Sequence, residues 1–200
     1  MRKQVYEIVK IVAESLPKKI KVLEIGSLIV EEQEHLSVRK YFPEAEYVGV
    51  DIQQGNGVDV VDDCADMIDD CVDRLDNCIE YCYKQENNSR FDLILYLDML
   101  EHTKEPYAVI DMAKYALKPD GVLLVTSVLN FHIHEYPNDY WRFTPKCFKM
   151  LLGYKSRVYK IGSDLMPHTV IGIQYPENMY LNINTEINKY CKEQTERELS

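Results

Sequence analysis

The 200-residue sequence predicts an α/β protein with a doubly wound, mostly parallel seven-stranded sheet and an antiparallel closing strand. Short apolar segments alternate along the chain with segments of helical spacing, which is the pattern of such folds. The first two apolar segments, 21–25 and 47–51, also have the form of a βαβ half-unit. A tight turn at Gly26 follows the first segment, and a carboxylate, Asp51, stands at the end of the second.

Two helices are expected before and within this half-unit. The first helix has apolar residues at helical spacing: Val5, Ile8, Val9, Val12 and Leu16. Pro17 ends this helix before the strand at 21–25. The second helix is expected over residues 31–41, ends before Pro43 and leads into the strand at 47–51.

The middle of the chain predicts a strand, a helix and a further strand. A turn cluster at 53–57 precedes a short strand at 58–61. The helix that follows has one apolar face, formed by Ile68, Cys71, Val72, Leu75, Cys78, Ile79 and Cys82. We expect its three cysteines to pack in the core rather than bind metal, because no C-x-x-C pair is present. A polar loop at 84–90 then leads to a buried strand at 91–97.

The second half of the chain completes the predicted sheet. A helix is expected at 106–117, and the turn residues 118–121 end it. The strand at 122–127 is almost continuously apolar, which indicates parallel pairing with helices on both faces of the sheet. The segments 157–161 and 169–174 are expected to be two closing strands.

We expect one domain over residues 1–175 and a polar C-terminal tail over residues 176–200. The tail has a modest helical stripe that could dock against a second copy of the chain: Ile183, Ile187 and Tyr190. No apolar run approaches the roughly 20 residues that span a bilayer, and the N-terminus has no signal-peptide core. The six cysteines then indicate reduced thiols, and so a cytoplasmic protein without a membrane partner.

The charge of the chain argues against nucleic acid as a partner. The formal net charge is −10, and residues 51–80 hold ten acidic residues and one arginine, a balance of −9. An acidic surface of this kind repels phosphate backbones. It leaves room for a small cofactor that carries a positive centre.

The ligand site is expected at the carboxyl ends of the strands, where doubly wound sheets bind their ligands. Four segments with acidic or polar groups should converge there: 24–28, 51–55, 62–67 and 96–102. A carboxylate at position 51 could accept hydrogen bonds from both hydroxyls of a ribose. The sequence therefore predicts a site for an adenosine-type cofactor.

Five segments, in this order, resemble the motifs of class I S-adenosylmethionine-dependent methyltransferases: Glu24-Ile-Gly26, Val50-Asp51, Asp63-Cys-Ala-Asp66, Phe91-Asp-Leu-Ile-Leu95 and Met99-Leu-Glu-His102. Residues 118–126 are similar to the passage from helix to fifth strand in that family. Residues 139–145, Asp-Tyr-Trp-Arg-Phe-Thr-Pro, resemble a segment of a bacterial subgroup that acts on small molecules. The resemblance implies a Rossmann-like methyltransferase fold and methyl transfer to a small-molecule acceptor, such as the hydroxyl of a sugar or another metabolite.

The resemblance also implies which residues bind S-adenosylmethionine: Glu24, Gly26, Ser27, Asp51, Ile52, Asp63, Cys64, Tyr96 and Asp98. Gly26 would let the backbone approach the methionine moiety, and Glu24 would support the ammonium group. Asp51 would take the ribose hydroxyls, and Asp63 the adenine amino group. The two further glycines usual in the first loop are absent here, which counts against a dinucleotide enzyme that needs G-x-G-x-x-G.

The catalytic candidates lie after the fifth strand. His134 is the first candidate for a base that takes the proton of an acceptor hydroxyl, with Asp139 and Tyr140 behind it. A histidine pair, His132 and His134, could bind metal, but no third ligand is evident in sequence, so we predict no metal. His102 is expected to cap or pack.

Three alternatives remain open at this stage. Trp141 could fill the core or form part of an aromatic lid over the substrate. The protein could be a non-catalytic S-adenosylmethionine-binding or scaffold protein with the same fold. A nicotinamide oxidoreductase shares only the βαβ geometry.

Overall fold

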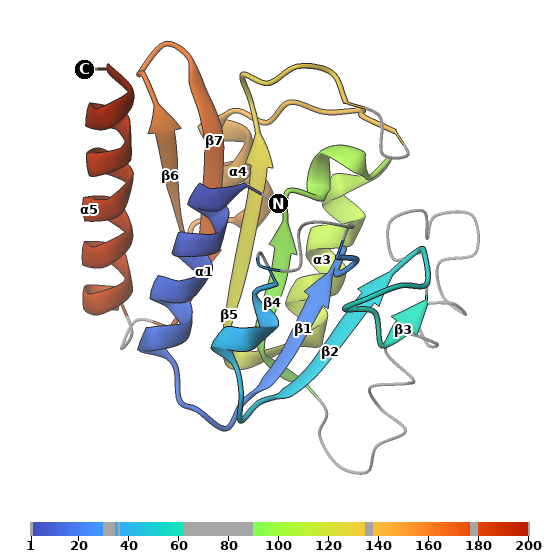
Figure 1. The fold of residues 1–200 in the computed structure, drawn as a ribbon. Coiled ribbons are helices and arrows are strands. Elements are labelled where there is room, and N and C mark those ends of the chain that lie inside the picture. The colour runs from blue at the N-terminus through green and yellow to red at the C-terminus, as the bar shows by residue number, and fades with distance from the viewer. Residues whose placement is uncertain are drawn as a thin grey trace.

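The computed structural model describes residues 2–29, 35, 37–61, 90–134, 138–176 and 180–199. Within them seven strands form one sheet in the order β3-β2-β1-β4-β5-β7-β6 (Figure 1). The strands are β1 (Lys21–Ile25), β2 (Glu46–Asp51), β3 (Val60–Val61), β4 (Phe91–Leu97), β5 (Leu117–Val128), β6 (Ser156–Gly162) and β7 (Pro167–Gln174). The helices are α1 (Lys3–Ser15), α3 (Pro106–Ala116), α4 (Pro145–Leu152) and α5 (Tyr180–Leu199), with 3-10 turns η2 (Arg39–Tyr41) and η3 (Leu100–His102).

The strand pairing confirms the predicted fold class. β1 pairs in parallel with β2 and β4, and the parallel ladder continues outward to β3 and β5. β7 runs antiparallel between β5 and β6. Strands β4 and β5 are almost wholly buried, as expected for parallel strands covered on both faces.

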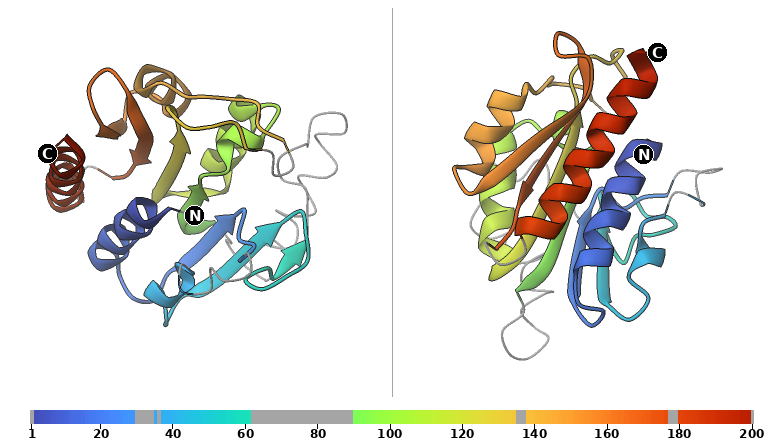
Figure 2. Two further views of the ribbon diagram at one scale, coloured as in Figure 1. Left: turned by 45° about the horizontal axis from the view of Figure 1, so that its top comes forward. Right: turned by 90° about the vertical axis from the view of Figure 1, so that its left-hand side faces the viewer.

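Helices cover both faces of the sheet, as the two views of Figure 2 show. The helices α1 and α5 lie on one face, where Val9, Ile183 and Leu95 belong to one buried cluster. The helices α3 and α4 lie on the other, where Ile110 and Phe148 pack with the strands in a second cluster. This alternation of strand side chains between two covered faces is the physical basis of the doubly wound architecture.

The structure differs from the sequence prediction at several element boundaries. β5 begins at Leu117, which pairs with Phe91, and the turn residues 118–121 form an irregularity inside this strand rather than a loop before it. Residues 37–41 contain only the 3-10 turn η2, and part of the helix expected over 31–41 lies outside the described residues. The helix expected over 68–82 also lies outside them.

Helix α4 was not predicted, although the sequence marks its start. The Thr144 hydroxyl accepts a hydrogen bond from the backbone N–H of Cys147, and Pro145 occupies the first helical position. Both are standard residues for these positions, because a hydroxyl satisfies a free N–H and proline lacks one.

The C-terminal stripe packs inside the chain. Ile183 and Ile187 on α5 are fully buried against β6, β7 and α1, and Tyr190 packs against the same cluster. The stripe is therefore covered by the chain's own sheet and helix, and it does not offer a surface to a second copy. No helix within the described residues has the length and apolar character needed to cross a bilayer.

Candidate functional site

The first loop, after β1, approaches the end of β2 through its backbone. Gly26 has a φ of +78°, a left-handed conformation that favours glycine. The N–H groups of Gly26 and Ser27 both donate to the carbonyl of Val50. A Cβ at Gly26 would lie 2.4 Å from Cγ of Met99, so the glycine makes room for Met99 as well as for the turn.

Asp51, at the carboxyl end of β2, faces this first loop. Its Oδ2 accepts from the backbone N–H of Leu28 at 3.0 Å, and its Oδ1 accepts from the N–H of Gln53 at 3.1 Å. A carboxylate has about four lone-pair sites, so these bonds leave one on each oxygen. Two neighbouring hydroxyl donors, as in a ribose, fit those sites, and the residues at this position therefore suit an adenosine-type cofactor.

The first and second loops are joined by close backbone contacts. The N–H of Ile29 donates to the carbonyl of Asn56. A Cβ at Gly57 would lie 2.5 Å from the carbonyl oxygen of Ser27, and one at Gly55 would lie 2.4 Å from Cδ1 of Leu28. Small residues in the second loop thus allow the two loops to pack closely.

The other cofactor candidates have different surroundings. Ser27 is buried, and Ile52 is 39% exposed at the end of β2. Oε2 of Glu24 accepts a hydrogen bond from the Tyr47 hydroxyl at 2.7 Å, and desolvation raises the pKa of Glu24 to about 7. The Glu24 carboxyl thus has a partner on β2. Asp63 and Cys64 lie outside the described residues.

Asp98, just after β4, forms an ion pair that sequence reasoning missed. Its Oδ1 and Oδ2 accept from Nη2 and Nε of Arg2 at 2.5 and 3.0 Å, and the Thr126 hydroxyl also donates to Oδ1. Burial raises the pKa of Asp98, but Arg2 and Thr126 together lower it by more. The pKa of Asp98 therefore lies below its usual value. The φ of Asp98 is +53°, a strained backbone for a residue that is not glycine. Arg2 therefore ties the start of the chain to the end of β4.

Tyr96, the other candidate on β4, is buried with Leu100 and Phe143 in the cluster beneath α3 and α4. Its placement is that of a core side chain beside the site. The proposed contact with the cofactor therefore remains a prediction.

Glu101 is a site residue that the sequence analysis did not single out. It lies in η3 and is fully buried. Its Oε2 accepts from the Ser127 hydroxyl at 2.6 Å, whereas Oε1 is buried with no hydrogen-bond partner among the described residues. Desolvation, with a smaller contribution from Asp98, raises the pKa of Glu101 to about 7.

Two of the predicted catalytic residues, His134 and Asp139, lie together. The Asp139 carboxylate accepts from the backbone N–H of His134 at 2.8 Å and from the guanidinium of Arg142. Hydrogen bonds from Arg142 hold the pKa of Asp139 well below its usual range. Nδ1 of His134 lies 3.1 Å from Oδ2 of Asp139, but without the alignment of a hydrogen bond.

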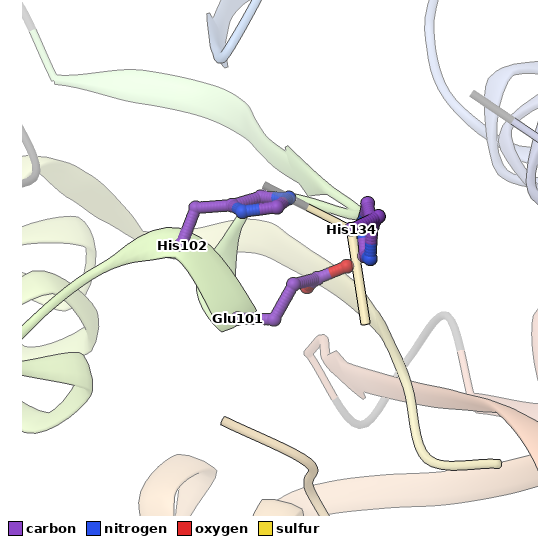
Figure 3. A group of neighbouring side chains, drawn as sticks. All are labelled: Glu101, His102 and His134. Atoms are coloured by element: carbon purple, nitrogen blue, oxygen red, sulfur yellow. The ribbon is translucent and has the colours of Figure 1, made fainter. Parts of the chain in front are cut away.

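His102 and His134 lie beside Glu101, and Figure 3 shows the three side chains directed toward one another. The two rings are edge to face with centroids 4.9 Å apart. One ligand atom from each of the three residues lies within 4.8 Å of the others, the only such group within the described part of the chain. We call these three residues the Glu101 cluster. Glu101 is the third donor that the sequence analysis did not find, because 33 residues separate it from His134.

The segment after residue 138 closes over this cluster. The backbone N–H groups of Tyr140 and Trp141 donate to the carbonyl of Glu101. The Trp141 indole N–H donates to the carbonyl of Thr103 at 2.8 Å, and its ring stacks on Phe143. The side chains of Tyr140 and Trp141 are 45% and 43% exposed. Trp141 is therefore only half-buried. Tyr140 holds the segment in place through its backbone N–H and not through its side chain.

Comparison with known proteins extends these observations. A family model described as a methyltransferase domain matches residues 1–151. The ubiquinone biosynthesis O-methyltransferase of Haemophilus ducreyi is 43% identical over 42 residues, which are 21% of this chain and 18% of that protein. The corresponding protein of Actinobacillus pleuropneumoniae serotype 5b is 44% identical over 39 residues. The matches thus span less than a fifth of the length of these curated relatives.

Solved structures share the fold over most of the chain. A SAM-dependent methyltransferase from Archaeoglobus fulgidus has a TM-score of 0.60 at 15% identity and covers 88% of this chain and 95% of its own. A second structure is the 1,6-didemethyltoxoflavin-N1-methyltransferase of Burkholderia thailandensis, solved with 1,6-didemethyltoxoflavin and S-adenosylhomocysteine. It has a TM-score of 0.54 at 13% identity, and the match covers 86% of this chain and 78% of that one. At these identities the likeness establishes the fold alone.

Proposed function

Because the chain belongs to the methyltransferase domain family, whose members use S-adenosylmethionine, we propose that it methylates a hydroxyl group of a small molecule. Family membership confirms the sequence-based prediction of an S-adenosylmethionine-dependent enzyme. It also removes the reason for considering a nicotinamide oxidoreductase.

The proposal rests on one observation: two groups of residues with different chemistry lie at the same edge of the sheet. Asp51 and Gly26 suit a ribose and a closely approaching cofactor, and the Glu101 cluster suits a polar acceptor. Glu101 is fully buried, whereas His102 and His134 are partly buried. A recessed carboxyl favours a small acceptor over a macromolecule, as do the acidic charge and the small-molecule acceptor named for the Burkholderia protein.

The cofactor, when bound, supplies a methyl carbon that its sulfonium makes electrophilic, and displacement leaves a neutral thioether. The protein's part is then to align the acceptor oxygen and to ease the loss of its proton. In our proposal Asp51 and Ile52 hold the nucleoside, with Asp63 and Cys64 at the adenine. Gly26, Ser27, Glu24, Tyr96 and Asp98 lie toward the methionine end.

His134 faces the acceptor in this proposal and assists loss of the hydroxyl proton. Asp139 orients the imidazole from behind, because its carboxylate bonds the His134 backbone and lies 3.1 Å from Nδ1. Tyr140 borders the acceptor from the same segment.

Calorimetry with S-adenosylhomocysteine tests the cofactor half of this proposal. We expect Asp51→Asn to weaken binding about 10–100-fold, because hydrogen bonds to a charged group contribute roughly 1.5–3 kcal/mol. Asp111→Asn is the matched control, since Asp111 is an exposed aspartate on α3 paired with Lys114. Release of S-adenosylhomocysteine with a panel of small hydroxylated acceptors tests the other half. Unchanged affinity in Asp51→Asn, or no product from folded protein with any acceptor, would contradict the proposal.

A further inference from the structure

The Glu101 cluster has the donor atoms of a metal site. It offers a carboxylate oxygen and two imidazole nitrogens, all within 4.8 Å of one another. Metal–ligand bonds of about 2.0–2.2 Å place the donors of one ion roughly 3–3.5 Å apart. Small side-chain rotations therefore bring the three atoms onto a single ion.

One polar atom in the cluster is buried and unpaired. Among the described residues, Oε1 of Glu101 has no hydrogen-bond partner, whereas Nδ1 of His134 lies 3.1 Å from Oδ2 of Asp139. Burying such a group unpaired costs about 1–3 kcal/mol. An ion between the two side chains removes this cost for the Glu101 oxygen and fixes the His134 ring.

His102 is oriented as metal-binding histidines are. Its Nδ1 contacts the backbone carbonyl of Asn138, so the ring proton lies on Nδ1 and the lone pair lies on Nε2. A carbonyl behind the distal nitrogen is the usual means of fixing the tautomer of a metal-bound imidazole.

The charges around the cluster favour a cation. Asp98 pairs with Arg2, and Asp139 pairs with Arg142. Glu101 instead has the neutral Ser127 hydroxyl as its partner. When Glu101 is ionised, the three carboxylates exceed the two guanidinium groups by one negative charge, which is located at the cluster.

We propose that Glu101, His102 and His134 bind one divalent transition-metal ion, and that Zn²⁺ fits this donor set best. Imidazole nitrogens suit zinc and its neighbours, whereas Mg²⁺ and Ca²⁺ prefer oxygen ligands. Three protein ligands leave a coordination position for an outside oxygen.

The catalytic role of the ion rests on the proposed function, whereas binding of the ion to the protein does not. An acceptor hydroxyl in the open position would ionise more readily, as zinc-bound water ionises near pH 7 instead of about 15.7. His134 would then assist proton loss as a ligand of the ion rather than by taking the proton itself, and the proton would pass to solvent water.

Metal binding is tested on the full chain after dialysis against a chelator. We expect titration with Zn²⁺ to show one saturable ion per chain. Glu101→Gln and His102→Ala should each weaken it by more than the roughly 10–100-fold that loss of an outer hydrogen-bond partner costs. His35→Ala is the control, because His35 is an exposed histidine outside the cluster. Co²⁺ in place of Zn²⁺ should give a visible spectrum without the thiolate charge-transfer band that cysteine ligation produces.

Three results would overturn the proposal: no saturable Zn²⁺ binding, a thiolate band with Co²⁺, or equal affinity in wild type, Glu101→Gln and His102→Ala. Circular dichroism verifies that each variant folds, and His134→Ala on the partly exposed loop replaces any that does not. Calorimetry with S-adenosylhomocysteine on the same samples separates the two proposals. Zn²⁺ binding without S-adenosylhomocysteine binding would contradict only the proposed function, and the reverse would contradict only the metal site.

Discussion

The two halves of the site are built differently. The cofactor half, residues 26–29 and 51–57, is held by backbone contacts between neighbouring loops and by one carboxylate that accepts backbone N–H groups. The acceptor half, residues 99–103, 129–134 and 138–144 with the adjoining Arg2–Asp98 pair, is held by charged and aromatic side chains. Neutral backbone contacts tolerate many side chains, whereas buried ion pairs need both partners. The acceptor half should therefore be more sensitive to single substitutions.

Arg2→Ala should cause the largest loss of stability among these substitutions, because it disrupts the acceptor half. It leaves Asp98, whose side chain is only 13% exposed, without its partner, and removing one member of a buried ion pair costs up to about 3–5 kcal/mol. Because the folded pKa of Asp98 is below the usual value, the pair stabilises the protein above the unfolded pKa of about 3.9 and is lost as pH falls through the lower folded value. The wild type should thus lose its advantage over Arg2→Ala in strong acid. Chemical denaturation across pH measures both effects.

The control for this substitution is Lys3→Ala, the exposed neighbour of Arg2. It removes one positive charge from the same turn without touching Asp98. Equal losses in the two variants would show that general charge, rather than the ion pair, is responsible.

Gly26→Ala tests the cofactor half, with Gly153→Ala as its counterpart. Both glycines have φ between +78° and +85°, so alanine strains either backbone by about 1–3 kcal/mol. Only at Gly26 does the added Cβ meet a neighbour, since nothing lies within 4 Å of the Cβ position at Gly153. We therefore expect Gly26→Ala to lose more stability than Gly153→Ala, and only Gly26→Ala to bind S-adenosylhomocysteine more weakly. If both variants kept wild-type affinity, the first loop would not be the cofactor loop.

The same difference explains how much the sequence revealed. The cofactor half follows from local signals, since an apolar strand, Gly26 and Asp51 lie within one βαβ unit whose geometry is general. The acceptor half depends on pairs such as Arg2 with Asp98 and Glu101 with His134, which no periodicity connects. Glu101 and His134 follow β4 and β5, and they come together only because these two strands pair in parallel and end at the same edge of the sheet. Helix α4 is a different case, because Thr144 and Pro145 signal its start locally and a search for capping residues would have found it.

Trp141→Phe should have the smallest effect and shows which contacts of the acceptor half are replaceable. Phenylalanine keeps the stacking on Phe143 but loses the indole N–H that donates to the Thr103 carbonyl. A neutral hydrogen bond contributes about 0.5–1.5 kcal/mol, so we expect a loss of about 1 kcal/mol in chemical denaturation and unchanged S-adenosylhomocysteine binding. Tyr115→Phe, at an exposed tyrosine of α3, provides the baseline for losing one polar group from an aromatic ring. A loss as large as that of Arg2→Ala would refute the view that ion pairs, rather than neutral contacts, hold this half together.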